Sequence, residues 1–442
     1  MKQPKLAGLL SEPPGGVSGL VVAYSGGRDS TALLHALACM NHPLALRAVH
    51  VCHHLESAAA DWALHCARYC ALLDVPHARL DVSVDPTDGG LESAARDARY
   101  AALVADLAPG EVLVTAHHAE DQAETFLLQA LRGAGVAGLA GMPRLASFGP
   151  GRIWRPWLAV PRAEILAYAG THGLDWVEDD SNRDPRRARG HLRNRVWPAL
   201  LEQWPAAAET LARSAAWAGQ ANEAITTLAG VDLEAVRGAG DTLRIEGLAA
   251  LSPARRAEVV RRWLSETDRD RPDHRHLAEI ERLLGAREHA GPRVAFADTE
   301  VRRFDARLFA MARLPEPPPA GTEFVWHEGG HMLLPAGCGE LSLSVEGAGR
   351  IPPGLSVAFA RPGERLRRGD DRAEAVSEYL RRMRVPPWIR ARMPRIRVGD
   401  TLLALPGRWE HPRIADWFDG RVPRFDWQHN LVGDPAGRSR RD

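Results

Sequence analysis

Short apolar runs alternate with helical patterns over roughly the first 180 residues of the chain. Four runs, at residues 20–24, 46–51, 77–82 and 112–115, have the length and apolar content of buried strands. Between them, residues 30–40, 58–73 and 91–107 carry apolar side chains at helical spacing. This alternation predicts an α/β fold, a doubly wound and mostly parallel sheet with helices on both faces.

The pattern changes near residue 198. Residues 201–314 are rich in Ala, Leu and Arg with few strand signals, and they predict a helical domain whose clearest helices cover 211–228 and 252–264. The proline-rich segment 315–321 is then a stiff linker. Short strands broken by Gly and Pro, around a helix near 373–382, predict a small α+β domain over 322–442. The first domain occupies 1–200.

Composition narrows the function. The chain of 442 residues carries 56 basic and 56 acidic residues, so it is neutral overall. Lysine occurs only at Lys2 and Lys5, so arginine supplies 54 of the 56 cations. A Walker-type phosphate loop and a pyridoxal enzyme each need a lysine within the fold. Both classes are therefore excluded.

The cysteines and the N-terminal segment indicate the cellular compartment of the protein. Five cysteines without a C-x-x-C pair suit a reducing environment and disfavour a disulfide scaffold. The N-terminal apolar run is too short for a signal peptide, and no stretch approaches the roughly 20 apolar residues of a membrane-spanning helix. We expect a cytoplasmic protein without a membrane partner. Whether it forms a homodimer stays open.

The strongest local signal is the hexapeptide between the first predicted strand and helix, composed of Ser25, Gly26, Gly27, Arg28, Asp29 and Ser30. Glycines let the backbone approach an anion, and the helix that follows presents unpaired N–H groups and its positive dipole end to a phosphate. Asp29 would lie beside that phosphate, which requires a bridging cation, and Mg²⁺ is the natural choice. The alternative is an ordinary strand-to-helix turn capped by Asp29 or Ser30.

A second polar group follows the strand at 112–115. His117, Asp121 and Glu124 are spaced to share one helix face, at the same sheet edge as the hexapeptide. We expect Asp29 and Asp121 to hold Mg²⁺. His118 and Asp121 could instead cap the helix. Zinc is the weaker alternative, because the sequence fixes no third imidazole or thiolate nearby.

Five segments occur in the order and at the spacing of one enzyme family. They are SGGRDS, VHVCHHL, ESAARDARY, AHHAEDQAETFLLQALRGAGVAGLAGM and RPWLAVPRAEILAYAGTHGLDWVEDDSN, beginning at residues 25, 49, 92, 116 and 155. Together they resemble the tRNA(Ile)-lysidine synthetases, which belong to the ATP pyrophosphatases and have a Rossmann-like PP-loop domain. Weaker similarity continues over 189–198 and 373–407, so the resemblance spans all three predicted domains.

The resemblance implies a reaction. Enzymes of this family use ATP to adenylate the C2 oxygen of the wobble cytidine in an isoleucine tRNA with anticodon CAU. The amine of free L-lysine then displaces AMP and gives lysidine. The expected cofactors are ATP, as a substrate, and Mg²⁺.

Residue roles follow by position. The resemblance implies that residues 25–30 bind ATP and that Asp29, His117, Asp121 and Glu124 surround the reacting groups. It also implies that Arg96 or Arg99, Arg189 and Arg193 face the phosphates or the cytidine, and that Asn182 lies at the substrate. Which of Arg96 and Arg99 reaches the nucleotide stays open. This chain has Gly190 where the family usually has Asn, and Cys52, His53 and His54 where it commonly reads NHG.

Positive charge is segregated despite the neutral total. Residues 183–195 hold six arginines against one acid, and residues 361–413 hold fourteen against seven. Such stretches suit phosphate-backbone contacts, and we expect Arg381 and Arg382 to bind tRNA. Solvated arginine-rich faces are the alternative. Trp388 is expected to pack rather than to stack on RNA.

Two other functions compete with the lysidine reaction. A tRNA thiolase would need a catalytic or cluster-binding cysteine pair, and Cys66 and Cys70 share a helix face that is most simply core. A non-enzymatic RNA-binding protein would have no need of carboxylates beside a phosphate loop.

Overall fold

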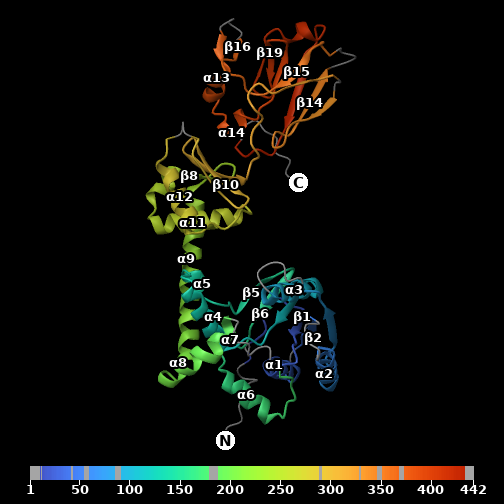
Figure 1. Cartoon of the computed structure of the whole chain (residues 1–442), viewed down its shortest axis with the longest axis vertical. Coiled ribbons are helices and arrows are strands. Elements are labelled where there is room, and N and C mark those ends of the chain that lie inside the picture. The colour runs from blue at the N-terminus through green and yellow to red at the C-terminus, as the bar shows by residue number, and fades with distance from the viewer. Residues whose placement is uncertain are drawn as a thin grey trace. The chain divides into compact units, whose positions relative to one another are not determined.

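The computed structural model describes residues 10, 12–40, 43–53, 59–84, 91–178, 188–287, 291–327, 330–345, 351–367 and 373–433. The chain divides into two compact units, Met1–Ala224 and Ile225–Asp442 (Figure 1). The boundary falls inside the long helix α9 (Ala207–Val236). The predicted domain boundaries stay a prediction.

A six-stranded sheet forms the centre of the first unit, in the order β3-β2-β1-β4-β6-β5. Its strands are β1 (Gly19–Ala23), β2 (Ala45–Cys52), β3 (His77–Asp81), β4 (Glu111–Val114), β5 (Leu145–Phe148) and β6 (Gly151–Trp154). All neighbours are parallel except the β5–β6 hairpin. The predicted mostly parallel sheet is confirmed, whereas the hairpin was not anticipated.

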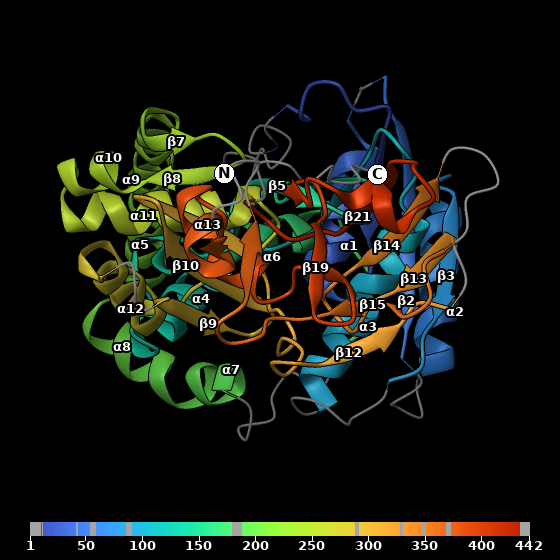
Figure 2. The same ribbon diagram turned by 90° about the horizontal axis from the view of Figure 1, so that it is seen from above.

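Alternate residues of the central strands pack on opposite faces. Leu20 and Val22 of β1 join one apolar core, and Val21 joins the other. Helices α1 (Arg28–Ala38), α2 (Ala59–Leu72) and α6 (Arg162–Thr171) contribute to the first core, and α3 (Leu91–Asp106) to the second. Both views place α2 beside β2 and β3 (Figures 1 and 2). The sheet is therefore doubly wound, because it is covered on both faces.

The rest of the first unit is helical. It contains α4 (Ala119–Leu131), α5 (Val136–Leu139), α7 (Ala188–His191), a π-helical turn (Leu192–Val196) and α8 (Trp197–Gln203), followed by the first half of α9. Ala123 of α4, Leu192 and Trp197 share a small apolar core with the start of α9. This packing sets the π-helical turn against α4, which matters for the site below.

The second unit begins with helices and a sheet. Helices α10 (Ile245–Ala250), α11 (Pro253–Glu266) and α12 (His274–Gly285) pack with a five-stranded sheet in the order β7-β8-β11-β10-β9. Its strands are β7 (Arg237–Gly238), β8 (Thr242–Arg244), β9 (Arg293–Phe296), β10 (Thr299–Phe304) and β11 (Arg307–Ala312). The helices were predicted; the sheet was missed, because its short strands are interrupted by arginines.

The C-terminal part is built from antiparallel strands. One sheet has the order β12-β15-β18-β19-β20, a second β13-β14-β21, and a hairpin joins β16 to β17. These strands are β12 (Glu323–Val325), β13 (Gly330–Leu333), β14 (Glu340–Val345), β15 (Leu355–Ala358), β16 (Arg365–Arg367), β17 (Ala373–Ala375), β18 (Arg395–Val398), β19 (Thr401–Leu405), β20 (Trp409–Glu410) and β21 (Pro423–Gln428). Helices α13 (Val376–Arg382) and α14 (Pro387–Arg390) complete the predicted small α+β fold, together with a 3₁₀ turn at Ile414–Trp417.

Candidate active site

The loop between β1 and α1 is a tight glycine turn that leads directly into the N-terminus of α1. Gly27 is the N-cap of α1, and the first intrahelical bond runs from the Thr31 amide to the Gly27 carbonyl at 2.9 Å. The N–H groups of the three residues between them therefore precede the helical ladder and point outward along the positive end of the dipole. Gly26 has φ +80°, and a Cβ there would lie 2.9 Å from the Cys66 Sγ atom. A side chain at Gly26 is thus excluded by both strain and space.

Serine hydroxyls fix the conformation of this loop. Ser25 Oγ lies 3.0 Å from Ser30 Oγ and accepts the Gly27 amide at 3.3 Å. The Ser30 hydroxyl in turn donates to the Gly27 carbonyl at 2.8 Å. Both hydroxyls thus lie on this loop, as the sequence predicts. The guanidinium of Arg28 lies 5.7 Å from the centre of the Trp176 ring, so this side chain stacks on a neighbouring loop.

Asp121 and Glu124 lie on one face of α4, and Arg193 of the π-helical turn binds both. Arg193 donates to Glu124 through Nε at 2.5 Å and Nη2 at 2.9 Å, and to Asp121 Oδ1 at 2.9 Å. Glu124 is almost fully buried, with 2% of its surface exposed. The bidentate contact with Arg193 satisfies both oxygens of this buried carboxylate. Sequence reasoning named all three residues, and the structure brings them together.

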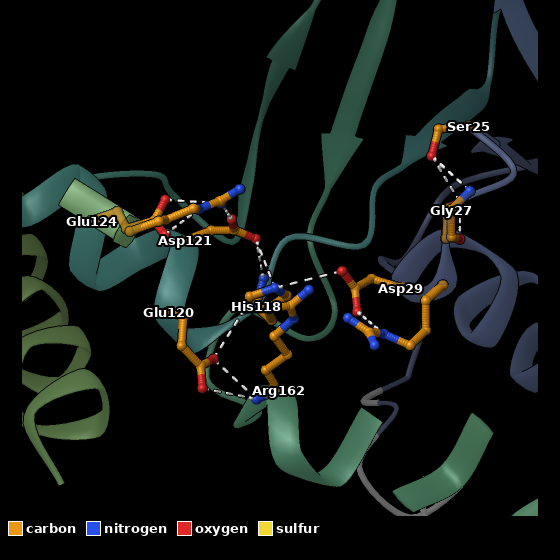
Figure 3. A network of polar contacts seen from close by, with 11 residues as sticks. Ser25, Gly27, Asp29, His118, Glu120, Asp121, Glu124 and Arg162 are labelled. Atoms are coloured by element: carbon orange, nitrogen blue, oxygen red, sulfur yellow. Dashed lines mark hydrogen bonds and ion pairs between the residues drawn. The ribbon is translucent and has the colours of Figure 1, made fainter. Parts of the chain in front are cut away.

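His118 connects this cluster to the phosphate loop (Figure 3). Its Nε2 atom lies 3.4 Å from Asp121 Oδ2 and 3.8 Å from Asp29 Oδ2, and its Nδ1 atom lies 3.0 Å from Glu120 Oε2. Burial alone would lower the pKa of His118, but the Glu120 hydrogen bond and the two aspartates raise it above its ordinary value. Two carboxylates from separate strand ends thus converge on one imidazole nitrogen.

Asp121 also caps the helix. Its Oδ2 atom accepts the His118 amide at 3.1 Å, which closes a capping box at the start of α4. The capping alternative raised from the sequence is therefore correct for Asp121, and it coexists with the Arg193 contact. Opposing effects act on this carboxyl: burial raises its pKa, while His118, His117 and Arg193 together hold it below its ordinary value.

His117 does not share the helix face of Asp121 and Glu124, contrary to the sequence expectation. The helix begins at Ala119 with His118 as N-cap, so His117 precedes it. Its Nδ1 atom lies 2.8 Å from the Thr115 hydroxyl. Burial is the main cause that lowers the pKa of His117, and the nearby arginines 155, 189 and 96 act in the same direction. The ring is therefore a neutral hydrogen-bonding group near neutral pH.

Sequence reasoning missed Glu120. Besides contacting His118, its carboxylate accepts the Arg162 amide at 3.0 Å and 3.2 Å and so binds the start of α6. Contacts with His118 and Arg162 lower the pKa of Glu120, against the opposing effect of burial. The only signal was its place in the polar run 117–124, and nothing local tied it to α6, which begins more than 40 residues later.

The remaining predicted residues are placed as follows. Arg96 is exposed and lies over the Tyr100 ring at 4.9 Å, and Arg99 is exposed one turn further along α3. Arg189 donates to the Thr125 hydroxyl at 3.2 Å. Asn182 lies outside the described residues, as do three of the six arginines of 183–195, namely 183, 186 and 187.

The donor set suits a magnesium ion better than zinc. Asp29 Oδ1 is buried and makes no hydrogen bond, and Asp29 Oδ2 faces the same nitrogen as Asp121. In the described part of the chain, no three His, Cys, Asp or Glu side chains are arranged to hold a metal. Mg²⁺ takes one or two carboxylates and completes its shell with phosphate oxygens and water, whereas zinc takes three or four protein ligands. The residues present therefore fit Mg²⁺.

The cysteines do not form a redox or cluster site. Cys66 and Cys70 are fully buried in the core of the first unit. Burial raises the pKa of Cys66 to about 12 and that of Cys70 to about 11, so neither is a ready thiolate. The prediction that they are core residues is confirmed. The thiolase alternative therefore lacks the reactive cysteine pair that it would need.

Part of the arginine-rich segment 361–413 is internal. Arg395 and Arg397 are buried and share Glu364, and Arg392 donates to the Trp388 carbonyl at 3.0 Å. Trp388 is buried against Phe304 and Phe309, so it packs as predicted. The exposed arginines of the described segment are 365, 367, 381, 382, 384 and 413.

Comparison with protein families gives three matches along the chain. A PP-loop domain model matches residues 3–200, a TilS substrate-binding domain model matches 243–309, and a TilS substrate C-terminal domain model matches 355–427. None of the helices in the described residues is both long and apolar enough to cross a membrane.

Full-length relatives are similar throughout. A tRNA(Ile)-lysidine synthase of Xanthomonas campestris pv. campestris is 39% identical over 432 residues, covering 96% of this chain and 97% of the relative. Those of Pseudomonas aeruginosa and Escherichia coli O157:H7 are 40% and 38% identical, covering 90% and 93% of this chain and 92% and 96% of the relatives. Among solved structures, a U34-tRNA thiolase from Methanococcus maripaludis matches with a TM-score of 0.39 at 15% identity, over 48% of this chain and 76% of that one.

Proposed function

The chain belongs to the tRNA(Ile)-lysidine synthases, and we propose how its residues divide the work of this ATP-dependent tRNA modification. The observation that carries the proposal is the convergence of Asp29 and Asp121 on His118 beside the loop at residues 25–30. It brings the glycine turn and two carboxylates to one sheet edge, as phosphoryl-group chemistry requires.

The reaction has two steps. The C2 oxygen of the wobble cytidine bonds to the α-phosphorus of ATP, and the bond between the α- and β-phosphates breaks to release pyrophosphate. The amine of free L-lysine then bonds to C2, the C2–O bond breaks, AMP leaves with that oxygen, and the amine loses a proton to water. Neither step needs a protein nucleophile, so positioning and charge neutralisation supply the catalysis.

Each group has a part in positioning the nucleotide. The backbone N–H groups and the hydroxyls of Ser25 and Ser30 bind the ATP phosphates. Asp29 and Asp121 hold Mg²⁺, which supplies positive charge against the phosphates. Arg193 orients Asp121 and Glu124 through its hydrogen bonds to both.

Three further side chains act on the reacting groups. His117 is neutral and serves as a hydrogen-bonding partner. Arg96 and Arg189 oppose the negative charge that moves onto pyrophosphate and AMP.

The tRNA contacts extend beyond this edge. We assign Arg99 and Asn182 to the region around the cytidine, and Arg381 and Arg382 of α13 to the phosphate backbone. Both α13 arginines are exposed, although Arg382 also pairs with Glu374 at 3.0 Å. We place the enzyme in the cytoplasm, because five cysteines without a C-x-x-C pair suit a reducing compartment.

The test is AMP release from α-labelled ATP by the purified protein with Mg²⁺ and isoleucine tRNA of anticodon CAU, with and without free lysine. AMP that forms only with this tRNA and rises with lysine supports the proposal. AMP that forms with tRNA but ignores lysine would leave adenylation standing and reject lysine as the nucleophile. No AMP from folded protein would reject the assignment as a whole.

A further inference from the structure

Arg155 stands at the carboxyl end of a third strand of the same sheet edge. It directly follows β6, which runs parallel to β4. The Thr115 amide donates to the Trp154 carbonyl at 3.0 Å, which ties the end of β6 to the segment that carries His117. Ile153 faces the core that α3 covers, and strand alternation directs Arg155 to that same side of the sheet. No motif argument assigned this residue a role.

The guanidinium of Arg155 is buried, and only 8% of the residue is exposed. Its Nη1 atom donates to the Pro143 carbonyl at 2.7 Å, and the Tyr100 side chain is a second hydrogen-bonding neighbour. Its Nε atom is buried and has no acceptor. Among the described residues no carboxylate forms an ion pair with it. Burial lowers the pKa of Arg155, as expected of a desolvated cation without a neutralising partner.

Two side chains of α3 act on the charge of Arg155 in opposite directions. Tyr100 raises the pKa of Arg155, whereas the positive charge of Arg96 lowers it. The Arg96 guanidinium is exposed and lies 4.9 Å from the centre of the Tyr100 ring, which is itself fixed edge-on against Phe148 of β5 at 5.6 Å. One buried and one exposed guanidinium thus lie beside one aromatic ring, and the buried one has no carboxylate partner among the described residues. An anionic group of a reactant would supply that counter-charge.

We propose that Arg155, together with Arg96, binds an oxyanion of a reactant at the carboxyl end of β6. The inference rests on the proposed function, which brings two anionic species to this edge. One is the carboxylate of free lysine, and the other is a phosphate of ATP. Arg155 lies two strands from the loop at residues 25–30, a separation of about 10 Å at ordinary strand spacing. We therefore expect Arg155 to contact a different anionic group from the phosphate bound by residues 25–30.

The experiment compares Arg155→Met and Arg155→Gln with the native enzyme. The glutamine variant keeps a donor for the Pro143 carbonyl but not the charge. Arg152→Met is the matched control, because Arg152 lies on the same strand and only donates to the Gly15 carbonyl. Lysidine formation is measured with lysine and with lysinamide, whose carboxylate is replaced by an amide. ATP–pyrophosphate exchange with tRNA is measured without lysine.

Loss of a charged hydrogen bond predicts a fall of about 10- to 100-fold in one of these rates. If the anion is the lysine carboxylate, kcat/KM for lysine falls, while exchange and the lysinamide rate stay at native values. If it is a phosphate, exchange itself falls. Thermal midpoints of both variants should equal or exceed the native one, because an unpaired buried charge is removed.

Native rates in both variants with lysine and in exchange would overturn the inference. So would equal losses with lysine and lysinamide together with a lowered thermal midpoint, since that pattern describes a purely structural arginine. Should Arg155→Met fail to fold, Arg155→Gln decides alone. A native enzyme that makes no lysidine would instead reject the proposed function.

Discussion

At the scale of single residues, two carboxylates of the site differ in how they are held. Glu124 is almost fully buried, and both of its oxygens are bound by Arg193. Asp29 is held less tightly, because its buried Oδ1 atom makes no hydrogen bond and lies 3.9 Å from Arg28 Nε. We therefore assign Glu124 to the support of the site and Asp29 to the ligand.

Substitution of Asp29 or Asp121 by asparagine tests this distinction. Each change removes a negative charge but keeps a side-chain oxygen, so Asp121→Asn can still cap α4. We expect AMP formation to fall at least about 100-fold in each variant, because charge at the phosphates is no longer balanced. Affinity for tRNA, measured by filter binding, should stay nearly native. Asp97→Asn, an exposed change on α3, is the control. Full turnover in either variant removes that residue from the site.

Arg193→Met tests the supporting role of Glu124, the carboxylate that Arg193 binds. It leaves Glu124 buried without a partner, and we expect the free energy of unfolding to fall by about 1–3 kcal/mol, the range for an unsatisfied buried polar group. Adding Glu124→Gln should recover most of the stability but not the activity, because the buried charge disappears while the site stays disrupted. Urea unfolding and lysidine formation measure the two effects. Arg195→Met, on the same π-helical turn but exposed, should leave stability unchanged. An Arg193→Met variant of native stability would contradict the argument.

At the scale of elements, one arginine binds three of them together. Arg47 of β2 donates to Asp106 at the end of α3 at 2.6 Å, and to both oxygens of Glu111 at the start of β4 at 2.6 Å and 2.7 Å. The Arg47 hydrogen bond is the main cause that lowers the pKa of Glu111. A carboxyl whose pKa is lower in the folded state stabilises the fold above its unfolded pKa, and this contribution disappears as the pH falls through the folded value.

Arg47→Met should therefore lower the free energy of unfolding by about 1–3 kcal/mol at pH 7. The part of this deficit that comes from Glu111 should shrink as the pH falls below the ordinary pKa of Glu, about 4.3, and should vanish only below the lowered pKa of Glu111 in the native protein. Urea unfolding midpoints of the native and Arg47→Met proteins, compared at pH 7 and at acidic pH, measure this deficit. Arg79→Met, which breaks the more exposed pair with Asp81 on β3, should leave the free energy of unfolding nearly unchanged. A deficit that is the same at both pH values would show that Glu111 is not the linked group.

The helices and strands that the sequence predicted are those whose hydrophobic residues recur at clear helix or strand spacing. Strands β1 and β4 are short apolar runs, β2 and β3 carry apolar residues between polar ones, and their helices have clear apolar faces, so the predicted ends moved by no more than two residues. The β5–β6 hairpin and the sheet of the second unit were missed, because strands such as Thr299–Phe304 owe their pairing to neighbours rather than to their own pattern. His117 was placed on α4 because spacing alone does not reveal where a helix begins.

The residues of the site likewise divide into those that a local sequence motif reveals and those that it does not. Asp29, Asp121 and Glu124 sit in compact motifs and could be named from the sequence. Arg193 came from the family resemblance, since 69 residues separate it from Glu124. Glu120 and Arg155 could not be found, because their significance lies in a distant amide and in a missing counter-charge. Both are properties of tertiary packing and leave no local pattern.

At the scale of the whole molecule, a neutral chain must bind a polyanion with segregated charge. Several arginines of 361–413 are used internally, including the pair that shares Glu364. The net charge counted from the sequence therefore overstates the surface charge. The exposed arginines of the β16–β17 hairpin and α13, among them Arg381 and Arg382, are therefore the ones that we propose to face the tRNA.

Reversal of both α13 arginines to glutamate tests this assignment. Because each phosphate contact releases counterions, the slope of log affinity against log salt should fall by up to about 1.8 if both residues contact duplex phosphates. Binding should weaken at low salt, while the KM for ATP stays native, since α13 carries none of the residues assigned to the nucleotide. The double substitution to lysine preserves the charge and should keep the native slope, which separates phosphate contact from damage to the Arg382–Glu374 pair. A glutamate variant with the native slope would make α13 ordinary solvated surface, and the tRNA would have to be held by the remaining arginines of the hairpin.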